Sequence, residues 1–545
     1  MGGDAAVPVR ESMAAWTARQ WRAWRREKLT GGFVGAAFER GHRLRQRADS
    51  PASGSTQRVK VAIVGTGIAG LCAARQLRAA GVRDYRLFEL EDSAGGNSRS
   101  GRVGGFACPW GAHYLPVPDA DNEPLRQWLV EIGAARRAGD RLLFEERMTC
   151  HAPQERLLVD GTWQQGLLPF SLHERDRGPT FETDLQRFAR LIRSHRESGL
   201  FRLGASPRAD TAALHALDGQ TLRAWLDSLR IESPALRWYV DYCCRDDYGA
   251  GIDQVSAWAG IHYFASRHGF FDSEQARDRE MADRDLSEVL TWPQGNGWLV
   301  EKLAAAHRRE LLTGALVTRI DEQGLVVWRA AEQVSERWQA DHVVLAVPLF
   351  IAARLLASRP AALDALLPRL RYASWRVANV QVARAPQEKP GAPRAWDNVI
   401  HGDLSDGGLG YVDAMHQSLR SRPDATVFTT YFALGVENAA RQQLLDEDWS
   451  VQTGRVLDHL QKAHVDIREQ ARRVDIMRWG HAMIVPTPGL RSDPALADLR
   501  ELDGPLWFAH GDLAGYSVFE EAFAIGSEVG ARVAKAITGR HPAPG

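Results

Sequence analysis

The sequence has little lysine, no excess of charge of either sign and no long apolar run. Its 545 residues include 68 basic and 68 acidic side chains, and six of the basic ones are Lys. A chain without net positive charge lacks the field that nucleic-acid binding usually requires, so we expect no nucleic-acid partner. No run approaches the roughly 18 apolar residues of a membrane span, so we expect no integral membrane segment.

Cysteine is also scarce. The five cysteines are odd in number and form no Cys-x-x-Cys pair, which excludes a disulfide framework and a thiolate metal site. We interpret the adjacent Cys243 and Cys244 as buried thiols. A reducing, cytoplasmic compartment fits this usage best.

The first 57 residues form a basic N-terminal extension. Arg25-Arg26 followed by the apolar stretch Gly31–Phe38 resembles a twin-arginine export signal, which would place the protein in the periplasm. The apolar stretch is short, rich in glycine and closed by Glu39, so it makes a poor export-signal core. We favour a surface helix that covers the core and leaves the protein in the cytoplasm. A basic amphipathic helix carrying Trp16, Trp21 and Trp24 is a further alternative.

A strand, a glycine-rich loop and a helix begin at Arg58. The mostly apolar run Arg58–Gly65 is typical of a central parallel strand. Leu71–Ala80 predicts a helix that ends at Gly81, and Tyr85–Leu90 predicts a second strand. Together these segments predict a compact βαβ unit.

The loop within this unit has the pattern of a dinucleotide site. Gly65 allows a tight turn, Gly67 lets the backbone approach a pyrophosphate, and Gly70 permits close packing of helix on strand. Ile68 and Ala69 lie at the helix N-terminus, whose free N–H groups attract phosphates. The loop therefore predicts a bound dinucleotide.

An acidic residue follows at the expected spacing. Glu89 ends the second strand 19 residues after Gly70, where its carboxylate can accept from ribose hydroxyls, with Leu90 beside it. This pattern alone does not distinguish NAD from FAD.

The following blocks resemble the flavin-containing amine oxidase superfamily. The segment Glu91–Arg99 resembles a family block in which Gly-Gly-Arg extends the phosphate site. Here Gly95 and Gly96 are present, Asn97 stands where the Arg is expected, and Arg99 is placed to supply the charge.

Four further segments continue the resemblance. Cys108–Tyr114 looks like the turn that skirts the flavin ring, which implies contacts from Gly111, Ala112 and His113. Pro293–Trp298 is similar to the family's Pro-x-Gly-Gly segment. Val317 matches the position whose backbone meets the adenine, and His342–Pro348 resembles the strand that returns to the dinucleotide domain.

The C-terminal block resembles the family's closing motif. In Trp507–Asp512 an acidic residue follows an aromatic-rich strand, which implies that Gly511 and Asp512 contact the ribityl–pyrophosphate region. The next helix would point its N-terminus at the flavin pyrimidine and stabilise negative charge there. The residues expected to line the ring are Val518, Phe519 and Ala522.

The resemblance implies an α/β fold: a two-domain FAD/NAD(P)-binding Rossmann-like architecture of the glutathione-reductase type, with a mixed-sheet plus helical substrate domain. We expect FAD as cofactor and a discontinuous FAD-binding domain made of residues 58–115, 291–350 and 480–540. Residues 116–290 and 351–479 would form the substrate-binding domain. The predicted helices and strands in the rest of the chain are Leu222–Leu229, Leu236–Cys244, Leu316–Ile320, Leu325–Trp328, His342–Val347, Arg376–Val382 and Thr426–Ala433.

The chain departs from the family pattern at two places. The family commonly places a Lys near flavin N5, but Trp375–Val382 contains none, and the matching position lies near Ala378 or Asn379. Two aromatic rings often form a cage for the amine, and the matching positions here fall near His481 or Ala482 and at Val518. The electron acceptor, oxygen or another carrier, therefore stays open.

His481 is the candidate catalytic residue, because an imidazole titrates close to neutral pH and can remove a proton. A purely structural hydrogen bond is the competing interpretation. The cluster Arg245–Gly249 could bind the distal ammonium groups of a polyamine, or it could cap a helix. Trp396–Asn398 and Gly410–Tyr411 are further candidates for the same cavity.

We therefore expect an FAD-dependent oxidoreductase that transfers hydride from a small molecule, foremost an amine or polyamine, to flavin N5. Two alternatives stay open. The first is a desaturase or protoporphyrinogen-oxidase-like dehydrogenase acting on C–C bonds. The second is a non-catalytic binding module that retains the fold. The sequence leaves the oligomeric state undetermined.

Overall fold

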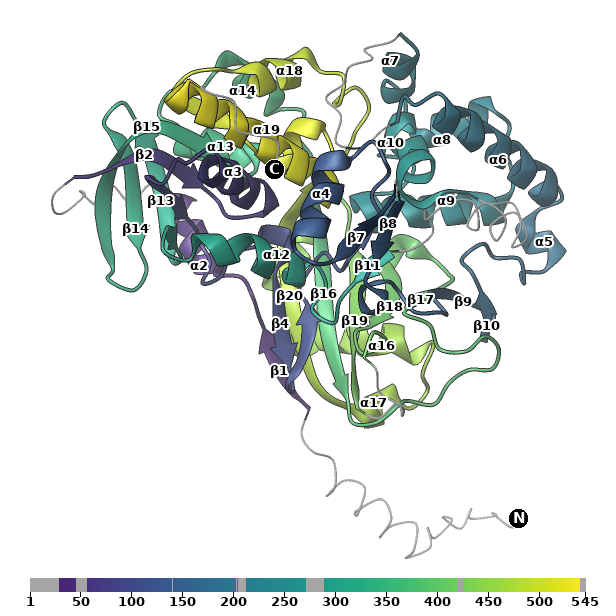
Figure 1. Cartoon of the computed structure of the whole chain (residues 1–545). Helices are drawn as coiled ribbons and strands as arrows, with labels where there is room; N and C mark the ends of the chain where they lie inside the picture. Colours follow the sequence, from purple (N-terminus) through teal and green to yellow (C-terminus); the bar gives the residue numbers. More distant parts are fainter. Residues whose placement is uncertain are drawn as a thin grey trace, which may run out of the picture.

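The computed structural model describes residues 29–45, 56–139, 141–201, 203, 212–270, 289–418 and 425–539. Two large sheets dominate it, one of seven strands and one of eight, with helices packed against both (Figure 1). The α/β architecture predicted from the sequence is confirmed. Within the described residues, no helix is long and apolar enough to cross a membrane.

The seven-stranded sheet contains the predicted βαβ unit. Its order is β12-β3-β2-β15-β14-β13, with β21 beside the second half of β15. The strands β12, β3, β2, β15 and β21 run parallel, whereas β13 and β14 are antiparallel additions. The strands are β2 (Gln57–Val64), β3 (Tyr85–Phe88), β12 (Leu311–Leu312), β13 (Ala315–Asp321), β14 (Gly324–Arg329), β15 (Val334–Leu345) and β21 (Leu506–Phe508).

The eight-stranded sheet is largely antiparallel. Its order is β1-β20-β16-β19-β18-β17-β9-β10, and only the β1–β20 and β17–β9 pairs are parallel. The strands are β1 (Thr30–Phe33), β9 (Glu155–Val159), β10 (Thr162–Gln165), β16 (Tyr372–Val382), β17 (Asp397–Ile400), β18 (Gly408–Asp413), β19 (Thr426–Ala433) and β20 (Ala471–Ile484). Three two-stranded antiparallel sheets complete the strands: β4 (Ser100–Val103) with β5 (Phe106–Pro109), β6 (Tyr114–Pro116) with β11 (Val289–Thr291), and β7 (Ala135–Ala138) with β8 (Arg141–Phe144).

Helices pack against both sheets. In Figure 1, α3 and α19 lie beside the seven-stranded sheet, and α5 to α10 gather on one side of the molecule. The first of these helices are α2 (Phe38–His42), α3 (Ile68–Ala79), α4 (Glu123–Glu131), α5 (Glu174–Arg177), α6 (Phe181–Glu197), α7 (Ala212–Asp218), α8 (Leu222–Ser228), α9 (Pro234–Tyr248) and α10 (Ala257–His262). The others are α12 (Gly297–Ala304), α13 (Leu349–Leu355), α14 (Ala361–Leu366), α15 (Asn438–Asp446), α16 (Trp449–Gln461), α17 (Ile467–Gln470), α18 (Pro494–Glu501) and α19 (Phe519–Thr538). A π-helical turn, Tyr263–His268, extends α10.

The predicted helices and strands occur where the sequence placed them, with shifted ends. The helix α9 begins at Pro234 because the Ser233 side chain accepts from the Leu236 N–H, and it ends at Gly249 in a left-handed conformation. The helix α3 starts at Ile68, directly after the second glycine of the loop. The predicted domain boundaries stay a prediction.

The N-terminal extension differs from the predicted surface helix in its described part. Thr30–Phe33 forms the edge strand β1, paired with β20, and the short helix α2 follows it. The glycines that make this stretch a poor export-signal core also let its backbone approach β20 closely. Gly31 has a φ of +139°, and a Cβ there would collide with the Val474 carbonyl. Arg25, Arg26 and the three tryptophans lie outside the described residues.

Candidate functional site

The glycine loop has the geometry that a dinucleotide site requires. Gly65 has a φ of +94°, and a Cβ there would lie 2.5 Å from the Ala346 carbonyl oxygen. A Cβ on Gly70 would collide with the carbonyl of Gly65 itself. At Gly67 the nearest atom to a Cβ would be the Gly96 Cα at 4.0 Å, so this side of the loop is open. The space between the two glycine turns therefore gives a phosphate group access to the N-terminus of α3, at Ile68 and Ala69.

Glu89 lies where the ribose is expected. Its carboxylate is buried and accepts from the Thr66 N–H at 3.0 Å and the Glu91 N–H at 2.9 Å. Burial raises the pKa of Glu89 above its usual value. The Ala315 N–H donates to the Glu89 carbonyl at 2.8 Å, which brings β13 and Val317 beside Glu89 and Leu90. The ladder between β13 and β14 is irregular directly after Val317.

The second glycine block is tied to the first. The Gly95 N–H donates to the Thr66 carbonyl at 2.8 Å, and the Asn97 side chain donates to the Ala482 carbonyl. Arg99 is 4% exposed; it donates from Nε to the Gly96 carbonyl at 3.2 Å and lies 3.5 Å from the Glu91 carboxylate. Because Glu91 pairs with this guanidinium, a role for Arg99 as direct phosphate ligand stays a prediction.

The turn expected to skirt the flavin ring is held by three side chains of the eight-stranded sheet. Asn379 of β16 donates to the Pro109 carbonyl at 2.9 Å. Trp479 of β20 donates to the Trp110 carbonyl at 2.7 Å, and Tyr431 of β19 donates to the Gly111 carbonyl at 3.2 Å. Three consecutive carbonyls thus have donors from three different strands, which fixes the turn relative to that sheet.

The other side of the turn is fixed by neighbouring segments. The Ala112 N–H donates to the Asn97 carbonyl at 2.9 Å. Asn296 donates from its backbone to the Ala112 carbonyl at 3.1 Å and from its side chain to the Tyr114 carbonyl at 2.9 Å. A Cβ on Gly295 would lie 2.8 Å from the Cα of His113, so this glycine segment packs directly on the turn.

Asp512 lies beside the end of β15. Its Oδ2 accepts from the Leu349 N–H at 2.9 Å and the Tyr372 hydroxyl at 2.5 Å. Its buried Oδ1 lies 3.1 Å from His510 Nδ1, which also accepts from the Asp512 N–H. Burial acts to raise the pKa of Asp512, but His510 and these donors hold it below its usual value. An ionised, buried carboxylate whose Oδ1 has only this imidazole as neighbouring polar group keeps acceptor capacity for ribityl hydroxyls, so the residues present fit FAD.

The start of α19 follows Gly511 and Asp512 closely. Val518 caps the helix, and Ala522 lies 3.9 Å from where a Cβ of Gly511 would be. The Phe519 ring stacks against Trp128 of α4, with centroids 6.4 Å apart. Tyr516 donates to Glu521 at 2.8 Å inside the protein, so it does not replace Val518 at the cage position.

A group of aromatic rings adjoins the turn. The His113 ring stacks on Tyr431, with centroids 4.5 Å apart, and lies 5.4 Å from the ring of Trp396. Burial lowers the pKa of His113 to about 3, so its imidazole is neutral near pH 7. Tyr114 contacts Trp396 at 5.9 Å and His268 at 5.8 Å. Sequence reasoning missed Tyr431, whose only signal was its place in the predicted strand Thr426–Ala433.

Two carboxylates lie within electrostatic reach of Tyr431 in this group of rings. They are Asp246 of α9 and Asp397 of β17, and both residues are partly exposed to solvent. Burial, followed by the charge of Asp247, raises the pKa of Asp246 to about 7. Burial and Asp246 also raise the pKa of Asp397 well above its usual range. Because the charge of Asp246 contributes to the raised pKa of Asp397, both carboxylates add to the same negative potential.

Asp247 faces a different partner. It forms a buried ion pair with Arg267, which also lies 3.3 Å from Glu520 in the first turn of α19. The cluster Arg245–Gly249 was predicted either to bind ammonium groups or to have a structural role, and its members differ in this respect. Arg245 pairs with Asp241 at 2.7 Å, Asp247 pairs with Arg267, and the charge of Asp246 acts on Asp397.

His481 lies apart from the ring group. Its ring contacts Phe350 at 4.7 Å and Tyr372 at 6.1 Å, on the side of Asp512. Within the described residues, no ring contact or hydrogen bond joins His481 to His113 or Tyr431. Burial and the nearby cations Arg441 and Arg45 lower the pKa of His481 to about 4. A catalytic role for His481 stays a prediction.

Side chains along the strand β16 point alternately to its two faces, and only one face contacts the turn Cys108–Tyr114. Val377 and Asn379 lie on that face, whereas Ala378 packs into a second core cluster on the other side. Of the two expected positions for the family's Lys, Asn379 lies on the face toward the turn and Ala378 does not, and the match itself stays a prediction.

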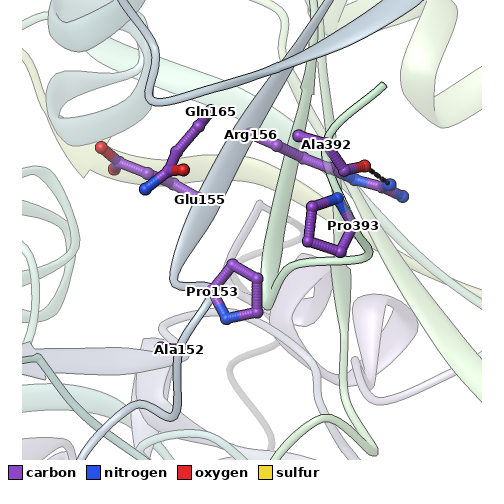
Figure 2. A pocket seen from close by; sticks show the side chains of 7 residues that line it. All are labelled: Ala152, Pro153, Glu155, Arg156, Gln165, Ala392 and Pro393. Atoms are coloured by element: carbon purple, nitrogen blue, oxygen red, sulfur yellow. Dashed lines mark hydrogen bonds between the residues drawn. The ribbon is translucent and has the colours of Figure 1, made fainter. Parts of the chain in front are cut away.

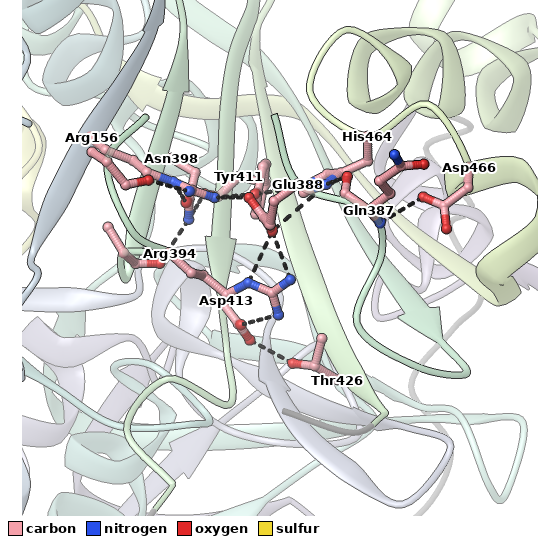
Figure 3. A network of polar contacts seen from close by, with 12 residues as sticks. Arg156, Gln387, Glu388, Arg394, Asn398, Tyr411, Asp413, Thr426, His464 and Asp466 are labelled. Carbon is pink, nitrogen blue, oxygen red and sulfur yellow. Dashed lines mark hydrogen bonds and ion pairs between the residues drawn. The ribbon is translucent and has the colours of Figure 1, made fainter. Parts of the chain in front are cut away.

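Asn398 and Tyr411 lie away from the carboxylates. They join a buried network around Arg156 (Figure 3), and Tyr411 packs in the second core cluster with Ala378, whereas Trp396 packs in the first. Arg156 donates to Asn398 at 2.6 Å and Glu388 at 2.7 Å, and the Tyr411 hydroxyl lies 2.7 Å from His464 Nε2. Their earlier assignment to the cavity is wrong, because neighbouring residues on a strand face opposite ways.

The same alternation operates on β9. Figure 2 shows Glu155 and Arg156 leaving this strand on opposite sides, around a cavity of about 230 Å³. Glu155 pairs in register with Asp397 and contributes to its raised pKa. A third carboxylate therefore extends the acidic group toward the surface.

Comparisons with known proteins agree with this geometry. Residues 68–533 match a family model described as flavin-containing amine oxidoreductase. A protein of Mycobacterium tuberculosis, named provisionally as a flavin-containing monoamine oxidase, is 25% identical over 294 residues, which are 53% of this chain and 57% of that protein. The chain thus spans little more than half the length of this relative.

Two solved structures show the same fold. A double mutant of putrescine oxidase has a TM-score of 0.61 and 18% identity, covering 89% of this chain and 100% of that one. Cyclohexylamine oxidase from Brevibacterium oxydans has a TM-score of 0.60 and 18% identity, covering 88% and 99%. The predicted two-domain FAD-binding fold is confirmed.

Proposed function

This chain belongs to the flavin-containing amine oxidoreductase family, whose cofactor is FAD, and we propose that it oxidises an amine, with diamines or polyamines as the leading substrates. When bound, FAD supplies a ring that accepts a hydride from the carbon beside the nitrogen. The observation that carries the proposal is that Asp246 and Asp397 act electrostatically on Tyr431, whose ring stacks on His113 beside Trp396. An acidic, aromatic site suits a cationic substrate, whereas an apolar one would suit a C–C dehydrogenase.

The chain's own residues divide the work in this proposal. The rings of His113, Trp396 and Tyr431 orient the substrate, and the neutral His113 places no positive charge beside an ammonium group. Asp246 attracts the ammonium when ionised. With a pKa of about 7 it is also suited to take a proton from it, which leaves the neutral amine needed for hydride loss.

A second candidate, oxidation of a C–C bond, is favoured by the missing Lys. The face of β16 toward the turn presents Val377 and Asn379, and Val518 stands at a cage position. The same absence leaves open whether oxygen or another carrier reoxidises the enzyme. A purified protein that is colourless and gains no flavin on reconstitution would instead support a binding module without catalysis.

Anaerobic reduction of the bound flavin tests the proposal. Monoamines, diamines, polyamines and unsaturated hydrocarbon precursors are each mixed with the holoenzyme, and loss of flavin absorbance is followed. We expect an amine to reduce the flavin, and Asp246→Asn to raise the KM by about tenfold or more. The matched control is Asp253→Asn, since Asp253 is a surface partner of Arg223. Reduction by the hydrocarbons alone would overturn the proposal, and the rate of reoxidation in air separates oxidase from dehydrogenase.

A further inference from the structure

The N-terminal segment Thr30–Arg45, here called the strap, is anchored at its start to the eight-stranded sheet. Its β1 strand pairs with β20, and the Val34 N–H extends this ladder by donating to the Ile476 carbonyl at 3.0 Å. The guanidinium of Arg478 lies 3.7 Å from the ring centre of Phe33. This end of the strap therefore belongs to the sheet on the substrate side.

The other end of the strap is anchored to the segment that follows β3. The Ala37 N–H donates to the Glu91 carboxylate at 2.9 Å. Arg40 donates to the Leu90 carbonyl and lies 2.9 Å from Asp92. The strap thus holds the three residues directly after Glu89, the predicted ribose ligand.

Between these two ends, one side chain joins the strap to the phosphate loop. Arg99 donates to the Gly35 carbonyl of the strap and to the Gly96 carbonyl of the glycine turn, and it pairs with Glu91. A single buried guanidinium therefore links the strap, the ribose segment and the phosphate turn.

We propose that the strap retains FAD by holding the Glu89–Asp92 segment and the Gly95–Arg99 turn in their binding positions. Asn97 stands where the family has an Arg, its side chain donates to the Ala482 carbonyl, and Arg99 is already paired. With less direct positive charge for the phosphates, binding depends more on the fixed directions of backbone N–H groups. The inference rests on the proposed placement of FAD at Glu89 and Gly96.

Release of FAD from the holoenzyme tests this inference with two matched pairs of variants. Gly31→Ala would drive a Cβ into the Val474 carbonyl, whereas Gly32→Ala meets no atom within 4 Å. Arg40→Ala removes the anchor to Leu90 and Asp92, whereas the exposed Glu39 makes no contact with that segment, so Glu39→Ala is its control. The rate is read from the rise in fluorescence of free flavin after dilution, and the melting temperature is measured with and without added FAD.

We expect Gly31→Ala and Arg40→Ala to release FAD about tenfold faster, and both controls to behave as wild type. The melting temperature without FAD should change little, while the increase on adding FAD should shrink. Wild-type release from both Gly31→Ala and Arg40→Ala would overturn the inference. Glu89→Ala separates the two failures: if it releases FAD while the strap variants do not, the cofactor placement stands and the strap role fails. If Glu89→Ala itself retains FAD, the placement and the strap role fail together.

Discussion

At the scale of single residues, Asp246 should control the pH dependence of turnover. Its pKa of about 7 means that the carboxyl is neutral below this pH and ionised above it. Binding of an ammonium group should therefore strengthen as the pH rises through about 7. We expect kcat/KM for an amine to rise over this range and Asp246→Asn to remove the rise, which a pH–rate profile measures.

His481 provides the comparison for this profile. Its pKa of about 4 keeps the imidazole neutral across the same range, so His481→Ala should leave the rise near pH 7 in place. If the rise in kcat/KM disappears in His481→Ala and persists in Asp246→Asn, then His481 and not Asp246 controls the pH dependence, which contradicts our proposal.

The same carboxyl should reduce stability at high pH. The folded-state pKa of Asp246 is raised from 3.8, so the native state holds more protons than the unfolded chain between about pH 4 and 7. The stabilisation from this group is complete below pH 4 and is lost as the pH rises through 7. We expect Asp246→Asn to be more stable than wild type at pH 8, on the order of 1–3 kcal/mol, and about equal at pH 4. Denaturant unfolding at both pH values measures this, and an equal difference at the two would contradict it.

Site residues were predictable from the sequence where they lie within contiguous motifs. Gly65 to Gly70 and Glu89 belong to one short βαβ block, and Asp512 belongs to the C-terminal block. Within each block the spacing of the residues along the chain predicts where they lie in the site. Tyr431 could not be found in this way. It meets its partners across strands that are distant in sequence, and an isolated Tyr in a strand carries no local pattern.

At the scale of elements, the packing of α19 on α3 should be sensitive to a single methyl group. A Cβ on Gly526 would collide with the Ala69 carbonyl, and one on Gly530 would lie 2.6 Å from the Ala73 carbonyl. We expect Gly526→Ala to cost about 1–3 kcal/mol of unfolding free energy and to weaken FAD binding, because α3 carries the glycine loop. Gly454→Ala in α16 is the control, since a Cβ there meets no atom within 4 Å. The helix propensity of Ala should make that variant about 0.5–1 kcal/mol more stable, so loss of stability in both variants would contradict the explanation.

Elements with a strong hydrophobic pattern were predicted well, and those without one were not. The strand β2 and the helix α9 follow their apolar periodicity and caps. The strand β1 has the sequence Thr-Gly-Gly-Phe, in which glycine usually opposes strand formation. It forms because its backbone pairs with β20, and such pairing leaves no trace in local propensity.

At the scale of the whole molecule, the two sheets should unfold together. Asn379, Tyr431 and Trp479 donate from one sheet to the turn that leads into the FAD site, and the strap crosses between the same two parts. We expect coincident thermal transitions by circular dichroism and tryptophan fluorescence, and a melting temperature lowered by about 5 °C on removal of FAD. Two separate transitions in the holoenzyme would show that these connections do not couple the sheets.

The three donors to Pro109, Trp110 and Gly111 have a consequence for how the protein can change over generations. Each carbonyl has its own donor on its own strand, so loss of one leaves two that still hold the turn. Because the three donors hold one turn, we expect the effects of losing them not to be additive. A substitution at one donor would then leave two that hold the turn beside the expected flavin site. A scaffold with this redundancy can explore new substrates without first losing its cofactor.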